Sequence, residues 1–178
     1  MKHFANHILQ VVQGEFRVSH RPDEEMSTLL GSCVAACIWD EARGIGGMNH
    51  FLLAQAQART TERDNRYGVH AMEMLINGLL RAGAERQALR AKLFGGAKIA
   101  ANLRDIGASN AEFARGYLRT EGIPCIAESL GGHQARRITF HPVTGRARQL
   151  LIPGEQVDEI PLRAGPPRAA PASLVELF

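Results

Sequence analysis

The sequence predicts a single domain of the α/β class with α+β layers, in which a central mixed β-sheet is flanked by two main helices. Short apolar segments and two amphipathic stretches follow one another in the order strands, helix, strand, helix, strands, which is typical of a layered domain. The 178 residues are enough to bury one hydrophobic core. A content of 45% hydrophobic and 22% charged residues is that of an ordinary soluble domain.

The first third of the chain has the pattern of β-strands. Residues 8–19 predict two short strands around Gly14, because apolar and polar side chains alternate there. Residues 34–39 predict a buried strand, since they are apolar and rich in small and β-branched side chains. After a turn at 40–44, residues 46–53 predict the next strand.

Two segments predict helices. In residues 69–80 apolar side chains recur at helical spacing, and Gly83 is the expected C-terminal cap. The second helix is expected to begin with a cap at Ser109 or Asn110 and to end at Gly122.

The remaining strands lie between and after these helices. One is predicted at residues 89–94 and three more at 123–127, 136–140 and 147–152. Residues 142–145 have the turn chemistry that joins the last two as a hairpin.

Residues 158–178 are predicted to form a flexible C-terminal tail after a domain of residues 1–157. The tail is rich in Pro, Arg, Ala and Gly, a composition that does not favour a packed core. Residues 174–178 end it with an apolar cluster, which would either pack loosely on its own domain or bind a partner.

The charge and composition narrow the class of partner. The net charge of +3 is a weak basic bias. No apolar run can cross a bilayer and residues 1–10 do not resemble a signal peptide, so we expect a cytoplasmic protein without membrane insertion. Without zinc-ligand spacing or an aromatic ribonucleoprotein signature, we expect neither a metal nor a nucleic-acid partner. Arginines late in the chain form either a solvated face or a surface for an acidic partner: Arg136, Arg137, Arg146, Arg148, Arg163 and Arg168.

The three cysteines are expected to be free thiols, because an odd number in a reducing compartment fits no disulfide framework. Cys33 is the candidate nucleophile. It follows Gly31 and Ser32, where a sharp bend in the backbone lets N–H groups face an oxyanion. The alternative is that Cys33 packs in the core as a small apolar side chain.

His50 is the histidine that strand geometry brings to Cys33. If the strands around the turn at 40–44 pair as an antiparallel hairpin, one register places His50 directly opposite Cys33. A register in which Asp40 pairs with Ile45 places it one diagonal step away on the same face. The alternative is an ordinary core histidine.

A hydroxyl from the preceding strand would fix the ring of this histidine. Ser27 and Thr28 are both close in sequence, and the residue pattern leaves open which of them does so.

Two segments of the sequence match a known family: Leu30-Gly31-Ser32-Cys33-Val34-Ala35 and Gly47-Met48-Asn49-His50-Phe51. Shorter matches follow at Arg66-Tyr67-Gly68, Ala71-Met72-Glu73, Phe94-Gly95-Gly96-Ala97, Ile106-Gly107 with Asn110, Gly131-Gly132 and Thr144-Gly145. Over residues 8–152 the sequence resembles the CheD family of chemoreceptor glutamine deamidases. The resemblance implies a fold shared with toxin-type deamidases.

The resemblance also implies an activity. It implies hydrolysis of glutamine side chains to glutamate and ammonia in the cytoplasmic domains of chemoreceptors, the methyl-accepting chemotaxis proteins. Cys33 would be the nucleophile and His50 its base, with no cofactor. Where the family usually has a threonine, six positions before the cysteine, this chain has Ser27. A CheC-type phosphatase is implied as a partner in some bacteria.

Two other functions fit the same residues. The protein could be a non-catalytic binding module that regulates a CheC-type phosphatase or docks on chemoreceptors. It could also be a cysteine amidase that acts on an unrelated protein or on a small molecule.

Overall fold

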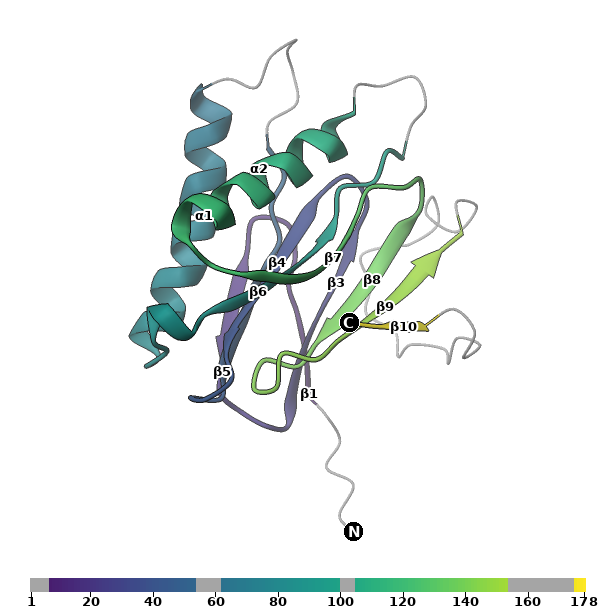
Figure 1. Ribbon diagram of the computed structural model, residues 1–178. Helices are drawn as coiled ribbons and strands as arrows, with labels where there is room; N and C mark the ends of the chain where they lie inside the picture. Colours follow the sequence, from purple (N-terminus) through teal and green to yellow (C-terminus); the bar gives the residue numbers. More distant parts are fainter. Residues whose placement is uncertain (1–6, 54–61, 100–104, 154–174) are drawn as a thin grey trace.

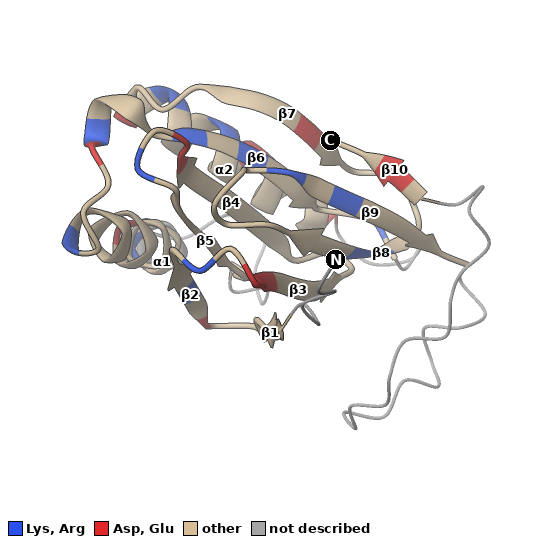
Figure 2. Ribbon diagram, turned by 90° about the horizontal axis from the view of Figure 1, so that it is seen from below, with Lys and Arg blue, Asp and Glu red and all other residues tan. Residues whose placement is uncertain are grey.

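The computed structural model describes residues 7–53, 62–99, 105–153 and 175–178. Two mixed β-sheets pack against each other, and two helices cover the outer face of one of them (Figure 1). In Figure 2 the two sheets are stacked face to face, and both helices lie on the far side of the sheet that contains β4. The α+β class, the single layered domain and the two helices are therefore confirmed, but the strands form two sheets instead of one central sheet.

The β3 sheet has the order β1-β3-β8-β9-β10, and only β1 and β3 are parallel in it. Its strands are β1 (His7–Gln10), β3 (Glu24–Leu30), β8 (Ala135–Phe140), β9 (Ala147–Ile152) and β10 (Val175–Leu177). The β4 sheet has the order β2-β5-β4-β6-β7, and only β6 and β7 are parallel in it. Its strands are β2 (Phe16–Ser19), β5 (Ile45–Asn49), β4 (Val34–Asp40), β6 (Arg90–Gly95) and β7 (Cys125–Leu130).

Strand β4 lies at the centre of three layers, and every residue in it is buried. Val34, Ala36 and Ile38 point toward the helices and join one hydrophobic cluster. The alternate residues, from Ala35 to Trp39, join a second cluster between the two sheets. Alternation along a strand thus gives β4 two apolar faces, as a strand covered on both sides requires.

Helix α1 (Glu62–Arg81) begins earlier than the predicted residues 69–80, and helix α2 (Ile106–Glu121) also begins before its predicted start. A short 3-10 helix, η1 (Arg86–Ala88), precedes β6. The N-terminal cap of α2 is Asp105, whose carboxylate accepts from the backbone N–H of Ala108, so the predicted cap at Ser109 or Asn110 is wrong. The C-terminal cap at Gly122 is confirmed by its left-handed φ of 67°.

The end of the chain packs on the domain. Strand β10 pairs antiparallel with β9, and the backbone groups of Phe178 exchange hydrogen bonds with those of Ala147. The ring of Phe178 lies edge-on to that of Phe94, with centroids 5.4 Å apart. Residues 154–174, which include most of the predicted tail, lie outside the described residues, so the domain boundary at 157 stays a prediction.

Lys92 of β6 lies buried between the sheets. Its Nζ donates to the carbonyl oxygen of Gly145 at 2.6 Å and to that of Phe178 at 2.7 Å. The same nitrogen lies 5.2 Å from the centroid of the Trp39 ring, within cation–π range. Burial lowers the pKa of this ammonium. One cation therefore joins β6, the turn after β8 and the end of the chain.

The arginines late in the chain have separate roles. Arg136 is buried, and its guanidinium donates to the carbonyl oxygen of Ser129 at 2.6 Å. Arg148 forms an ion pair with Glu25 at 2.8 Å across the surface. Arg163 and Arg168 lie outside the described residues. Figure 2 shows basic and acidic residues spread over both sheets instead of gathered in one patch.

Candidate active site

The pairing of β4 with β5 fixes the positions of Cys33 and His50. Asp40 pairs with Ile45, which is the register that sequence analysis linked to a diagonal arrangement. The same register continues to Val34 and Phe51, whose backbone groups exchange hydrogen bonds of 3.0 and 2.9 Å. Cys33 and His50 flank this pair and both point toward the β3 sheet, since side chains alternate between faces.

Thr28 holds the ring of His50. Its Oγ1 lies 2.6 Å from the carbonyl oxygen of Val11 and 2.8 Å from Nδ1 of His50. A carbonyl oxygen only accepts, so the single hydroxyl proton of Thr28 is donated to Val11. The hydroxyl oxygen must then accept from Nδ1–H, and we assign this tautomer to His50. Its Nε2 therefore carries the free electron pair that a general base needs.

Ser27 points away from this ring. Its hydroxyl donates to the carbonyl oxygen of Ile138 at 3.0 Å, within the β3 sheet. Neighbouring residues of a strand face opposite sides, so Ser27 and Thr28 cannot both reach His50 from β3. The residue that contacts the imidazole is Thr28, although the family's usual spacing falls on Ser27.

The thiol of Cys33 is partly buried, and burial raises its pKa to about 11. Burial also lowers the pKa of His50, which is 7% exposed. At neutral pH both groups are therefore uncharged in the free protein. Within the described residues Nε2 of His50 is buried and has no hydrogen-bond partner, so no other group occupies its electron pair. The sulfur instead has a contact with Gln13, whose Oε1 lies 3.6 Å away.

Asn110 of α2 holds the two chain segments that carry the site. Its Nδ2 donates to the carbonyl oxygen of Ser32 at 2.8 Å, and its Oδ1 accepts from the backbone N–H of Leu53 at 3.0 Å. A second contact comes from Ala97, whose N–H donates to the carbonyl oxygen of Gly31 at 2.9 Å. These bonds turn the carbonyl groups before Cys33 toward α2 and β6.

The backbone N–H groups of Ser32 and Cys33 lie in the turn that carries the sulfur. Among residues 7–53, 62–99, 105–153 and 175–178 no backbone carbonyl group accepts from either N–H. Both are donors available to an anionic oxygen beside the sulfur. The oxyanion role of the backbone at Gly31 and Ser32 stays a prediction.

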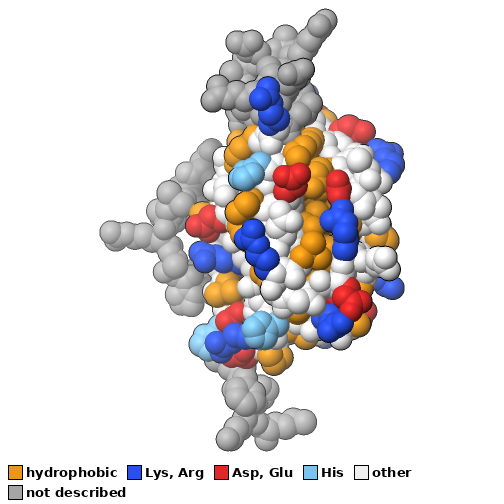
Figure 3. All heavy atoms as spheres, turned by 90° about the vertical axis from the view of Figure 1, so that its left-hand side faces the viewer, with side chains coloured by type: hydrophobic (Ala, Val, Ile, Leu, Met, Phe, Trp, Pro, Cys, Tyr) orange, Lys and Arg blue, Asp and Glu red, His pale blue; other side chains and the backbone are white. Residues whose placement is uncertain are grey.

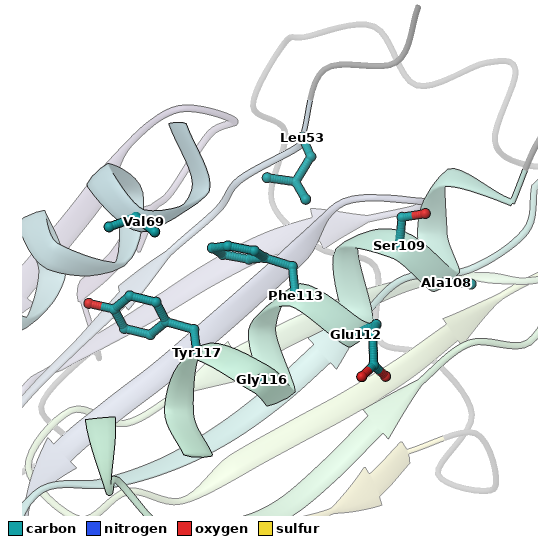
Figure 4. Close-up of a pocket in the computed structure, with 8 residues that line it drawn as sticks. All are labelled: Leu53, Val69, Ala108, Ser109, Glu112, Phe113, Gly116 and Tyr117. Carbon is teal, nitrogen blue, oxygen red and sulfur yellow. The ribbon is translucent and has the colours of Figure 1, made fainter. Parts of the chain in front are cut away.

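Hollows lie on several sides of the site. A groove of about 710 Å³ runs between α1 and α2, and Figure 4 shows Leu53, Val69, Phe113 and Tyr117 around it, with Glu112 turned away. Figure 3 shows bands of hydrophobic side chains among charged ones on the α1 side of the molecule. A smaller hollow of about 140 Å³ includes His50.

Metal clusters and membrane-spanning helices are both absent from the described residues. No group of three or more His, Cys, Asp and Glu side chains there is placed to hold a metal ion. No helix in the same part of the chain is both long and apolar enough to span a membrane. The positions of Cys33, His50 and Thr28 define a candidate cysteine–histidine site on an α+β scaffold, with a hydroxyl that orients the imidazole.

The comparisons with known proteins identify the family. Residues 52–149 match the sequence model of the family described as CheD chemotactic sensory transduction. A probable chemoreceptor glutamine deamidase CheD from Acidiphilium cryptum is 52% identical over 96% of this chain and 93% of its own length. A protein of the same name from Agrobacterium fabrum is 48% identical over 96% of both chains. This chain therefore belongs to the CheD family.

The match to solved structures is more distant. A crystal structure of the Bacillus licheniformis hypothetical protein YfiH has a TM-score of 0.45 and 16% identity, over 71% of this chain and 60% of that one.

Sequence reasoning missed two residues of the site. Gln13 lies on a turn that is distant in sequence from Cys33, and no local pattern marked it. Asn110 was expected as a helix cap, but it is buried one turn inside α2. A buried amide in an apolar helix face was the signal that a polar contact was needed there.

Proposed function

We propose that this protein is a cysteine-dependent glutamine deamidase that acts on the cytoplasmic domains of chemoreceptors. The observation that carries the proposal is the oriented imidazole, since Thr28 leaves Nε2 of His50 unprotonated on the face that Cys33 shares. The curated relatives have chemoreceptor glutamine deamidase in their names, which supports the substrate.

The reaction begins with proton transfer, because the resting thiol is neutral. Nε2 of His50 takes the thiol proton, and the thiolate of Cys33 attacks the carboxamide carbon of a receptor glutamine. The N–H groups of Ser32 and Cys33 stabilise the oxyanion. The imidazolium then gives its proton to the leaving ammonia.

Hydrolysis completes the cycle. The departure of ammonia leaves a thioester on Cys33, and His50 takes a proton from water as that water attacks the acyl carbon. Collapse of the second oxyanion releases glutamate and restores the thiol. Every step uses groups of this chain, the substrate and water.

The location and partners follow from the substrate. The enzyme would work in the cytoplasm, where the glutamines of chemoreceptor signalling domains are found. A CheC-type phosphatase as a binding partner stays a prediction.

The test is incubation of the purified protein with purified cytoplasmic fragments of several chemoreceptors. We expect release of ammonia together with conversion of particular glutamines to glutamate, located by peptide mass spectrometry. If no receptor is modified and no ammonia appears, the protein is a binding module and not a deamidase of this class.

Thr28→Val removes the hydroxyl but keeps the shape of the side chain. General-base catalysis raises a reaction rate by roughly 10²–10⁴-fold, and part of this acceleration is lost without the hydroxyl. We therefore expect kcat to fall about 10- to 100-fold with little change in KM. Thr28→Ser should restore most of the rate. The readout is the pH dependence of kcat in the two variants.

Ser27→Ala is the matched control, since Ser27 is buried on the same strand but bonds to Ile138. It should leave kcat unchanged and cost about 1 kcal/mol of stability through the lost hydrogen bond. A larger loss of kcat in Ser27→Ala than in Thr28→Val would remove Thr28 from the proposed role.

The raised pKa of the Cys33 thiol predicts how alkylation depends on pH. The thiolate is the reactive form, so alkylation of the free protein should be slow at neutral pH and rise roughly tenfold per pH unit toward about 11. The measurement is the rate of iodoacetamide labelling at Cys33 by peptide mass spectrometry. A rate at neutral pH equal to that at pH 10 would contradict a neutral resting thiol.

A further inference from the structure

The turn that carries Gln13 is fixed to the backbone of His50. Its ends are joined by a hydrogen bond of 3.0 Å from the N–H of Glu15 to the carbonyl oxygen of Val12, and Gly14 takes a φ of 88°. The N–H of Gly14 donates to the carbonyl oxygen of His50 at 2.8 Å, and the N–H of His50 donates to that of Glu15 at 3.1 Å. Val11 directly precedes this turn, and its carbonyl oxygen accepts the hydrogen bond from the hydroxyl of Thr28.

This arrangement presents a glutamine carboxamide to the candidate nucleophile of a glutamine deamidase. Oε1 of Gln13 accepts from the thiol of Cys33 at 3.6 Å. A carbonyl bond is about 1.23 Å long, so the carboxamide carbon lies within about 4.8 Å of the sulfur. Reacting atoms in near-attack geometry are about 3–3.5 Å apart. Gln13 is exposed, so rotation about its Cα–Cβ and Cβ–Cγ bonds can move the carboxamide carbon toward the sulfur.

We propose that Gln13 is an intramolecular substrate of Cys33 and is converted to glutamate by its own chain. The proposal rests on the proposed deamidase function. Gln13 is exposed, so the water that the hydrolytic step needs has access to it.

The step balances without an added reactant. The thiolate of Cys33 forms a bond to Cδ of Gln13, and the C–N bond breaks as the amide nitrogen takes a proton from His50 and leaves as ammonia. Water then adds to the thioester and the C–S bond breaks. The products are a glutamate side chain at position 13, ammonia and the restored thiol.

The product changes the site. A carboxylate replaces the carboxamide beside Cys33, and a negative charge there disfavours the thiolate. Modification of residue 13 would thus lower the activity of the chain toward other glutamines. Gln13→Glu reproduces the product, and it should alkylate at Cys33 more slowly than wild type at the same pH.

The experiment is peptide mass spectrometry of the full-length protein as a function of time after purification, for wild type and Cys33→Ala. We expect the mass difference between glutamine and glutamate to accumulate at residue 13 in wild type only. Gln10 and Gln87 are exposed in the same chain and serve as internal controls. Wild type that deamidates a receptor while its residue 13 remains glutamine would overturn the inference and leave the proposed function standing.

A mixing experiment separates reaction within one chain from reaction between two chains. Cys33→Ala keeps Gln13 but lacks the thiol, whereas Gln13→Ala keeps the thiol but lacks the substrate side chain. We expect Gln13 of the first variant to stay unmodified when the two are mixed. Its conversion in the mixture would overturn the intramolecular step. If wild type modifies neither receptors nor residue 13, the proposed function itself fails.

Discussion

Cys33→Ala is expected to reduce deamidation of a chemoreceptor fragment by at least about 10⁴-fold, since single removal of a nucleophile costs this much or more in enzymes that form an acyl intermediate. The fold should be retained, because the side chain is only partly buried and alanine is smaller. The measurement is ammonia release with peptide mass spectrometry of the receptor glutamines.

Cys37→Ala is the matched control for this variant. Cys37 lies on the same face of the chain but is fully buried in the cluster between the sheets. We expect it to lower stability modestly and to keep the activity. Retention of full activity by Cys33→Ala would show that the thiol is not the nucleophile.

Gly107→Ala is expected to give a large loss of stability, because α2 approaches a neighbouring backbone closely at this position. A Cβ at this position would lie 2.4 Å from the carbonyl oxygens of both Gly96 and Ala97, which are backbone atoms that cannot turn aside. The start of α2 would have to move, and Asn110 with it, so both segments that Asn110 holds would be displaced. We expect a loss of about 3 kcal/mol in the free energy of unfolding, together with reduced activity.

Gly116→Ala in the same helix provides the control. A Cβ there meets no atom within 4 Å, so the substitution should stabilise the protein by about 0.5–1 kcal/mol through its higher helix propensity. Urea unfolding of both variants measures the two effects. Equal stabilities of the two variants would show that α2 does not approach the backbone of Gly96 and Ala97 as closely as described.

The placement of Cys33 and His50 on one face could be predicted because it depends only on a short hairpin. Two strands joined by a short turn allow few registers, and the period of two fixes which side chains share a face. The division of the strands into two sheets could not be predicted. Alternation shows that both faces of β4 are covered, but the sequence does not say whether a helix or a second sheet covers each face.

The choice between Ser27 and Thr28 shows the same limit. Both are buried, so polarity and burial do not separate them. Thr28 is on the same face of β3 as Met26 and Leu30, which lie in the cluster between the sheets. Thr28 therefore points toward the β4 sheet, whereas Ser27 points away from it. That criterion requires knowing which face of β3 meets the β4 sheet, and this is a tertiary property.

The start of α2 was mispredicted although its signal is local. Asp105 directly precedes the helix and is as good a capping residue as Ser109 or Asn110. Gly107 lies in the first turn of α2, and glycine disfavours helix, so the sequence pattern placed the start of the helix too late. Its presence is explained by the close approach of α2 to the backbone at Gly96 and Ala97, which a single sequence does not show.

The buried ammonium of Lys92 has a consequence for spectroscopy. It lies over Trp39, which is the sole tryptophan of the chain, and the indole also packs edge-on against Phe140 of the facing sheet at 6.2 Å. The indole of Trp39 thus lies where the two sheets meet, next to the ammonium of Lys92 and the ring of Phe140. Its emission reports on whether the sheets stay joined, so the chain carries an intrinsic optical probe of that interface and needs no added label.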